Sequence, residues 1–135
     1  MKKIIFAILL ALLLTACAGR EIGNNAVGAV LPTECDTWPE NQYTDNLPVP
    51  PGTVQWTMVD EKHSYCAANL TGLTEEDFQN YMDSLDEDGF SVVEVVSEEI
   101  RGEDYVSTGT LLSNGEKNLS IAYIPDNMTI SISLP

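Results

Sequence analysis

The strongest constraint on the fold is an alternation of apolar and polar residues that recurs through the second half of the chain. It is clearest over residues 128–134, where Met, Ile, Ile and Leu alternate with Thr and Ser. Because successive side chains of a strand point to opposite faces, this period of two predicts a strand with one buried face. Residues 53–58 and 119–123 show the same period, and Asn114 before Gly115 is typical of a tight hairpin turn.

The sequence predicts one helix, over residues 75–88. Thr74 suits the N-cap, and Asp77 three residues later can complete a capping box. Gly89 suits the left-handed position that ends a helix. Apolar residues recur between these ends at helical spacing: Phe78, Tyr81, Met82 and Leu85.

Four valines between residues 92 and 96 predict a strand that is apolar on both faces, which is typical of the centre of a sheet. Further strands are predicted at 64–70 and 105–112, so the order along the chain is ββαββββ. The sequence therefore predicts an α+β fold, with one helix packed on an antiparallel sheet in a single small domain.

The first 16 residues have the organisation of a secretory signal peptide. Lys2 and Lys3 precede 11 apolar residues, Ile4–Leu14, whereas a membrane-spanning helix needs about 20. The run ends in Leu14, Thr15, Ala16 and Cys17, which resembles the lipobox of bacterial lipoproteins. This resemblance implies cleavage after residue 16, acylation of Cys17 and anchoring in the cell membrane, facing outside the cytoplasm, or in the outer membrane of a Gram-negative host. A secretory signal cleaved elsewhere is the alternative.

After this signal peptide, residues 17–46 have little periodic apolar pattern and predict a tether that begins at the lipidated cysteine. Residues 47–135 then form the predicted α+β domain. Cys35 and Cys66 are the remaining cysteines, and an even pair outside the cytoplasm favours a disulfide, with two free thiols as the alternative. Closing a loop of about 30 residues would stabilise the fold by roughly 3–4 kcal/mol on the chain-entropy model.

The charge of the chain is strongly acidic. The mature chain has four basic residues against 21 acidic ones, a formal charge of −17. Such a surface repels phosphate backbones, which argues against a nucleic-acid partner, and it attracts cationic proteins.

Few residues offer catalytic or metal-binding chemistry. His63 is the single histidine and lies in a predicted polar turn, so we expect no enzyme, no zinc site and no cofactor. Acidic residues are dense at two places, which keeps a weak calcium or ligand site open as an alternative. These groups are Asp83, Asp86, Glu87 and Asp88, and Glu98, Glu99, Glu103 and Asp104.

Short segments across residues 38–135 resemble a group of extracytoplasmic domains of unknown function on bacterial, mostly Gram-positive, surface lipoproteins. The segments are 38–41 (Trp-Pro-Glu-Asn), 47–50 (Leu-Pro-Val-Pro), the helix end at Gly89 and Phe90, and 128–132. The resemblance implies an extracytoplasmic α+β domain and no activity.

The sequence thus predicts a non-catalytic, membrane-anchored binding or structural lipoprotein with an envelope protein or a glycan as its partner. An inhibitor of a cationic enzyme such as lysozyme is the alternative, because the acidic charge would steer a basic enzyme to it.

Overall fold

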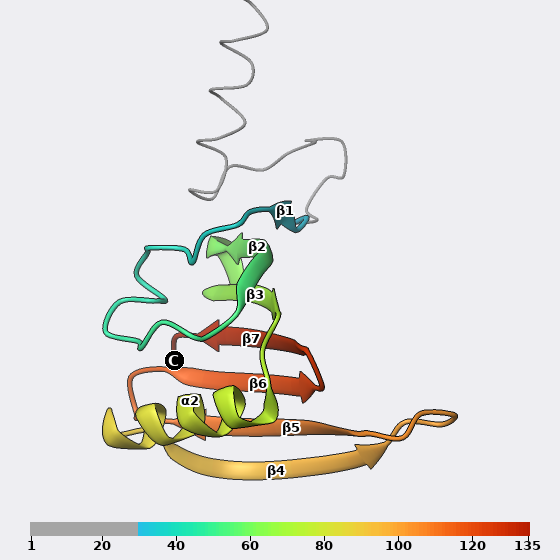
Figure 1. Cartoon of the computed structure of the whole chain (residues 1–135). Coiled ribbons are helices and arrows are strands. Elements are labelled where there is room, and N and C mark those ends of the chain that lie inside the picture. The colour runs from blue at the N-terminus through green and yellow to red at the C-terminus, as the bar shows by residue number, and fades with distance from the viewer. Residues whose placement is uncertain (1–29) are drawn as a thin grey trace, which may run out of the picture.

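A computed structural model describes residues 30–135, which form one antiparallel sheet with a helix against it (Figure 1). Within this part of the chain the sheet has seven strands in the order β1-β2-β3-β7-β6-β5-β4. The elements are β1 (Thr33–Glu34), β2 (Thr53–Asp60), the 3₁₀ turn η2 (Glu61–His63), β3 (Tyr65–Thr71), α2 (Glu75–Glu87), β4 (Ser91–Glu99), β5 (Val106–Ser113), β6 (Asn118–Ile124) and β7 (Asn127–Ser133).

The predicted α+β class and the order ββαββββ are wrong. The described residues are mostly β, because a single short helix accompanies the seven-stranded sheet. The order also gains a strand, β1, ahead of the six predicted ones. With two residues, β1 carries no periodic pattern, and it exists because Thr33 and Glu34 pair with β2.

Strand β4 is not the central strand that its valines predicted. It pairs with β5 alone and lies at the edge of the sheet. The central strand is β7, which pairs with β3 on one side and with β6 on the other. Apolar residues on both faces are common to a fully buried strand and to an uncovered edge, so the pattern alone does not separate the two.

One face of the sheet is covered. Along β7 its residues are Met128, Ile130 and Ile132, which are at most 1% exposed. Helix α2 packs its buried Phe78, Tyr81 and Leu85 against this face. The opposite face is polar along β3 and β7, where the Asn69 amide donates to Asn127 Oδ1 at 2.9 Å and to Thr129 Oγ1 at 3.0 Å. The alternation therefore predicted the two faces of β7 correctly. In β2 a register shift after Val54 turns Trp56 and Met58 to the opposite face, which the alternation did not predict.

The predicted helix is confirmed together with both of its ends. Thr74 and Asp77 form the capping box, each side chain accepting the other's backbone N–H. At the other end Gly89 has φ +91°, and Phe90 N donates to Leu85 O at 3.0 Å. These short-range bonds explain why the helix was readable from the sequence.

Part of the segment predicted as tether packs on the sheet. Tyr43 is 1% exposed and belongs to the same core as α2. Three hydrogen bonds hold this region: Lys117 Nζ donates to the carbonyls of Tyr43 and Asp45, and Tyr81 Oη donates to Pro48 O at 3.1 Å. The covered face is therefore closed by two pieces, residues 35–52 over β2 and β3 and α2 over β6 and β5 (Figure 1).

The predicted disulfide between Cys35 and Cys66 does not form, because Cys66 is a free, fully buried cysteine. Cys35 N donates to Gln55 O beyond one side of β2, whereas Cys66 pairs with Val59 across its other side. Strand β2 thus separates the two cysteines, and its pairing sites lie four positions apart, about 13 Å at roughly 3.3 Å per residue. A disulfide needs Cα atoms within about 7 Å.

We predict that Cys66 in the native protein resists a thiol reagent. Burial raises the pKa of its thiol, and the side chain is out of reach of solvent. Peptide mapping after alkylation should find Cys66 unlabelled in buffer and fully labelled in denaturant without reductant. A Cys66 that needs a reductant before it labels would contradict the structure.

Candidate functional site

The β4 edge is the most unusual surface of the described domain. The side chains of Val92, Val93, Val95 and Val96 are between 54% and 68% exposed. All nine residues of the strand are exposed, and only β5 pairs with it. An unpaired edge leaves a row of backbone N–H and C=O groups open, which can accept another strand.

The position of α2 explains why Val92 and Val95 stay uncovered, whereas Val96 lies on the opposite face, beside Gly109 of β5. Val92 pairs with Leu112 and Val95 with Thr110, two buried residues of the covered face. The apolar stripe of α2 packs over the strands further in, where Phe78 stacks on Tyr123 of β6. The helix therefore does not cover β4, which curves along the edge of the sheet beyond it (Figure 1).

A bulge adds to this exposure. The register shifts between Val92 and Glu94, so that Val93 is the extra residue on β4. A bulge bends its strand and increases the local twist. Val93 is the most exposed of the four valines, at 68%.

The two edges of the sheet differ. At the far edge β1 has two residues, a length that offers little to an incoming strand. At the near edge β4 offers nine residues, of which four are valines. Proteins usually protect an edge of that length, so the asymmetry marks β4 as the edge open to a partner.

Acidic side chains accompany the valines. Glu94 and Glu98 pair with Leu111 and Ser107 on the face opposite α2, and Glu99 ends the strand. Within residues 30–135 the basic residues are Lys62, Arg101 and Lys117, against 20 acidic ones. The α2 side of the edge therefore carries Val92 and Val95, and the opposite side carries Glu94 and Glu98 with Val96 between them.

His63 and Asp60 form the ion pair of the described region, with Nδ1 and Oδ2 2.6 Å apart. The hydrogen bond with His63 holds the pKa of Asp60 below its ordinary value. The His63 side chain is 63% exposed. Its place in η2 confirms the polar turn predicted there.

The acidic groups singled out in the sequence are exposed. Asp83, Asp86 and Glu87 lie on α2 and Asp88 caps its C-terminal end. In the part of the chain that the structure describes, no three His, Cys, Asp or Glu side chains converge on a point where they could hold a metal ion.

The lipobox and Cys17 lie outside the described residues, so their evidence comes from comparison with known proteins. Residues 1–18 match the model of the prokaryotic membrane lipoprotein lipid attachment site. The chain starts with a lipoprotein anchor signal. This match supports a lipid-anchored, membrane-associated bacterial lipoprotein that faces outside the cytoplasm. No curated protein gave a significant match to the sequence.

Among residues 30–135, no helix is long and apolar enough to cross a membrane.

We predict that Cys17→Ala releases the lipoprotein from the membrane, because alanine has no thiol to which lipid could be attached. Fractionation should move most of the protein out of the membrane pellet or leave it with an uncleaved signal peptide. Cys66→Ala is the matched control and should stay in the pellet. A Cys17→Ala protein that remains processed and membrane-bound would contradict lipidation at this residue.

Proposed function

We propose that this lipoprotein is a non-catalytic binding module of the cell envelope that captures a basic protein at its β4 edge. An extended segment of the partner would add to the sheet as an eighth strand. The observation that carries the proposal is the exposed nine-residue edge with its four valines. Main-chain hydrogen bonds would supply affinity, and the side chains beside β4 would supply specificity.

The faces of β4 define the chemistry of that segment. Residues of the added strand on the α2 side would lie beside Val92 and Val95, so apolar side chains suit them. Residues on the opposite side would lie beside Glu94, Val96 and Glu98, where lysine or arginine, with an apolar stem and a charged end, is favoured. Opposite charges across neighbouring strands contribute about 0.2–1 kcal/mol each. The expected segment therefore alternates apolar and basic residues.

Charge argues against a second copy of this chain as the occupant. Each mature chain carries a formal charge of −17, so two copies repel each other as they approach. Glutamates along an edge are also a common device against self-pairing. The same charges that repel a second copy attract a basic partner.

The absence of a catalytic role is part of the proposal. His63 is bonded to Asp60 on an exposed turn, and Cys66 is buried with its thiol pKa raised by that burial. Neither side chain has the arrangement of a base beside an accessible nucleophile. These observations support a role in binding.

A secreted cationic enzyme such as lysozyme has the required charge, so enzyme inhibition is a narrower form of the same proposal. Its support is the ratio of 20 acidic to three basic residues in the described domain. Slower hydrolysis of cell walls by lysozyme at a molar excess of this lipoprotein would favour that form.

The binding proposal is tested with a nine-residue peptide that alternates valine and lysine, added to the lipoprotein in a neutral detergent. We expect binding that persists at about 1 M salt, where the Debye length of roughly 3 Å leaves short-range contacts. The Val95→Ser/Val96→Ser variant should weaken binding by about tenfold, a loss of about 1.4 kcal/mol, because it removes two apolar side chains from the edge.

The matched control is Val49→Ser, since Val49 is also 68% exposed but lies away from β4. It should leave the affinity unchanged, and a peptide with glutamate in place of lysine should bind much more weakly. Equal binding of both peptides, or an equal loss in the two variants, would contradict the proposal. Binding of a cell-wall glycan fragment that the β4 substitutions leave unchanged would contradict the proposal and would indicate a glycan as the partner.

A further inference from the structure

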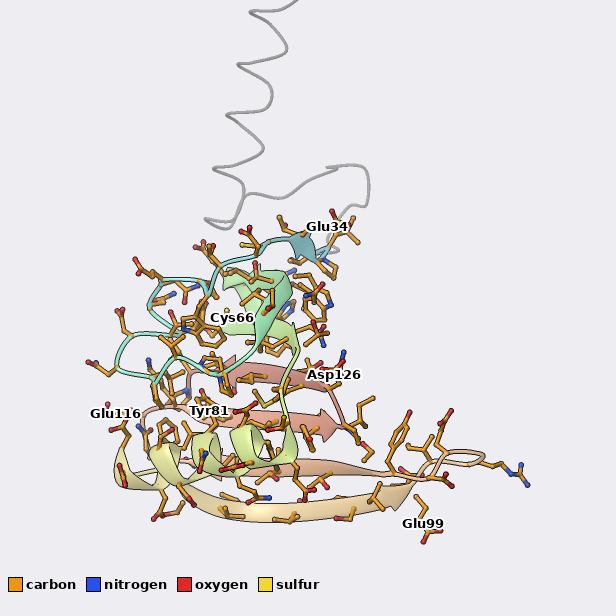
Figure 2. All side chains as sticks on the ribbon, in the orientation of Figure 1. Glu34, Cys66, Tyr81, Glu99, Glu116 and Asp126 are labelled. Atoms are coloured by element: carbon orange, nitrogen blue, oxygen red, sulfur yellow. The ribbon has the colours of Figure 1, made fainter. Side chains whose placement is uncertain are left out.

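A pocket of about 530 Å³ opens beside the start of α2, away from the residues assigned above to the β4 edge. Its walls come from three parts of the chain: the first turn of α2, the entry to β5 and the turn between β6 and β7. Its lining includes Glu75, Phe78, Asp104, Tyr105, Tyr123 and Asp126. Figure 2 labels Asp126 at the end of the sheet that holds this pocket.

Aromatic rings form one wall. Phe78 and Tyr123 stack with their centroids 4.3 Å apart and their planes 3° from parallel, and Tyr105 lines the same space. A flat aromatic wall of this kind suits an apolar stem and attracts a cation over a ring face.

The hydroxyl of Tyr123 is unused. The side chain is 7% exposed and lines the pocket, yet its hydroxyl forms no hydrogen bond with any residue from 30 to 135. No buried side-chain oxygen of the described residues lacks a partner, so the Tyr123 hydroxyl oxygen is open to the pocket and within reach of water. A ligand that donates a hydrogen bond could take the place of that water.

Negative charge surrounds this hydroxyl. Burial raises the pKa of Tyr123, and the carboxylates of Glu75, Asp126 and Asp77 raise it further. Asp126 uses one oxygen to accept from Gly72 N at 2.8 Å, while Glu75 and Asp104 make no hydrogen bond or ion pair in the described structure. None of the three described basic residues lines the pocket to neutralise them.

We propose that this pocket binds an organic cation, an ammonium or guanidinium group carried on an apolar stem. The charged group would donate to Tyr123 Oη and face the carboxylates of Glu75 and Asp104, while the stem would lie against the aromatic wall. Charge-assisted bonds of this kind are stronger than neutral ones. The inference does not depend on the β4 edge, because it rests on a different group of residues.

The experiment uses three blocked amino acids as probes, titrated into the lipoprotein in neutral detergent and followed by the NMR signals of residues around the pocket. The probes are N-acetyl methylamides of lysine, arginine and norleucine, the last being apolar and uncharged. We expect at least one cationic probe to bind with a Kd near or below about 1 mM and norleucine at least about tenfold more weakly. Equal shifts with all three probes, or none with the cationic ones at ten times that concentration, would overturn the proposal.

Variants assign the site. Tyr123→Phe keeps the ring stack and removes the hydroxyl, and Glu75→Gln removes one carboxylate; each should weaken cation binding by about tenfold. Glu116→Gln is the control, because Glu116 lies at the opposite end of the domain from Asp126 (Figure 2). An equal loss in Glu116→Gln would mean that overall charge, and not this pocket, attracts the probe. If Tyr123→Phe proved unstable, Glu75→Gln alone would decide the matter.

Discussion

The pairing of β7 with both β3 and β6 is the interaction on which the rest of the sheet depends. The last strand of the chain joins the group β1 to β3 with the group β4 to β6. Its Met128, Ile130 and Ile132 are at most 1% exposed and lie at the centre of the covered face. This pairing joins residues far apart in the chain, so the sheet is complete only after the C-terminal strand β7 has paired.

The place of each strand in the sheet then determines whether residues 35–52 or α2 cover it. Residues 35–52 and α2 close the face over β2, β3, β6 and β5, and the valines of β4 lie beyond both. An uncovered apolar edge on a mature chain with a formal charge of −17 combines attraction for apolar side chains with selection for basic ones. Anchoring at the membrane surface would present this edge to partners outside the cytoplasm.

Local signals could be predicted from the sequence, and long-range placement could not. The capping box of Thr74 and Asp77 and the alternation over 128–134 depend on neighbouring residues, so both led to the correct element. The place of β4 depends on which strands pair, and four valines look the same in a central strand and at an open edge. The disulfide prediction failed for that reason too, because β2 separates Cys35 from Cys66. The cation pocket draws Glu75 and Tyr123 from separate elements, and no spacing in the sequence joins them.

Amide hydrogen exchange of the purified lipoprotein, measured residue by residue, shows whether the β4 edge is open. We expect the amides of β7 to exchange slowest and the outward-facing amides of β4 to exchange almost as fast as in an unfolded chain. Adding the alternating valine–lysine peptide should slow those β4 amides and leave β1 unchanged. Outward-facing β4 amides as protected as those of β7 in the isolated lipoprotein would contradict the account, because the edge would already be covered.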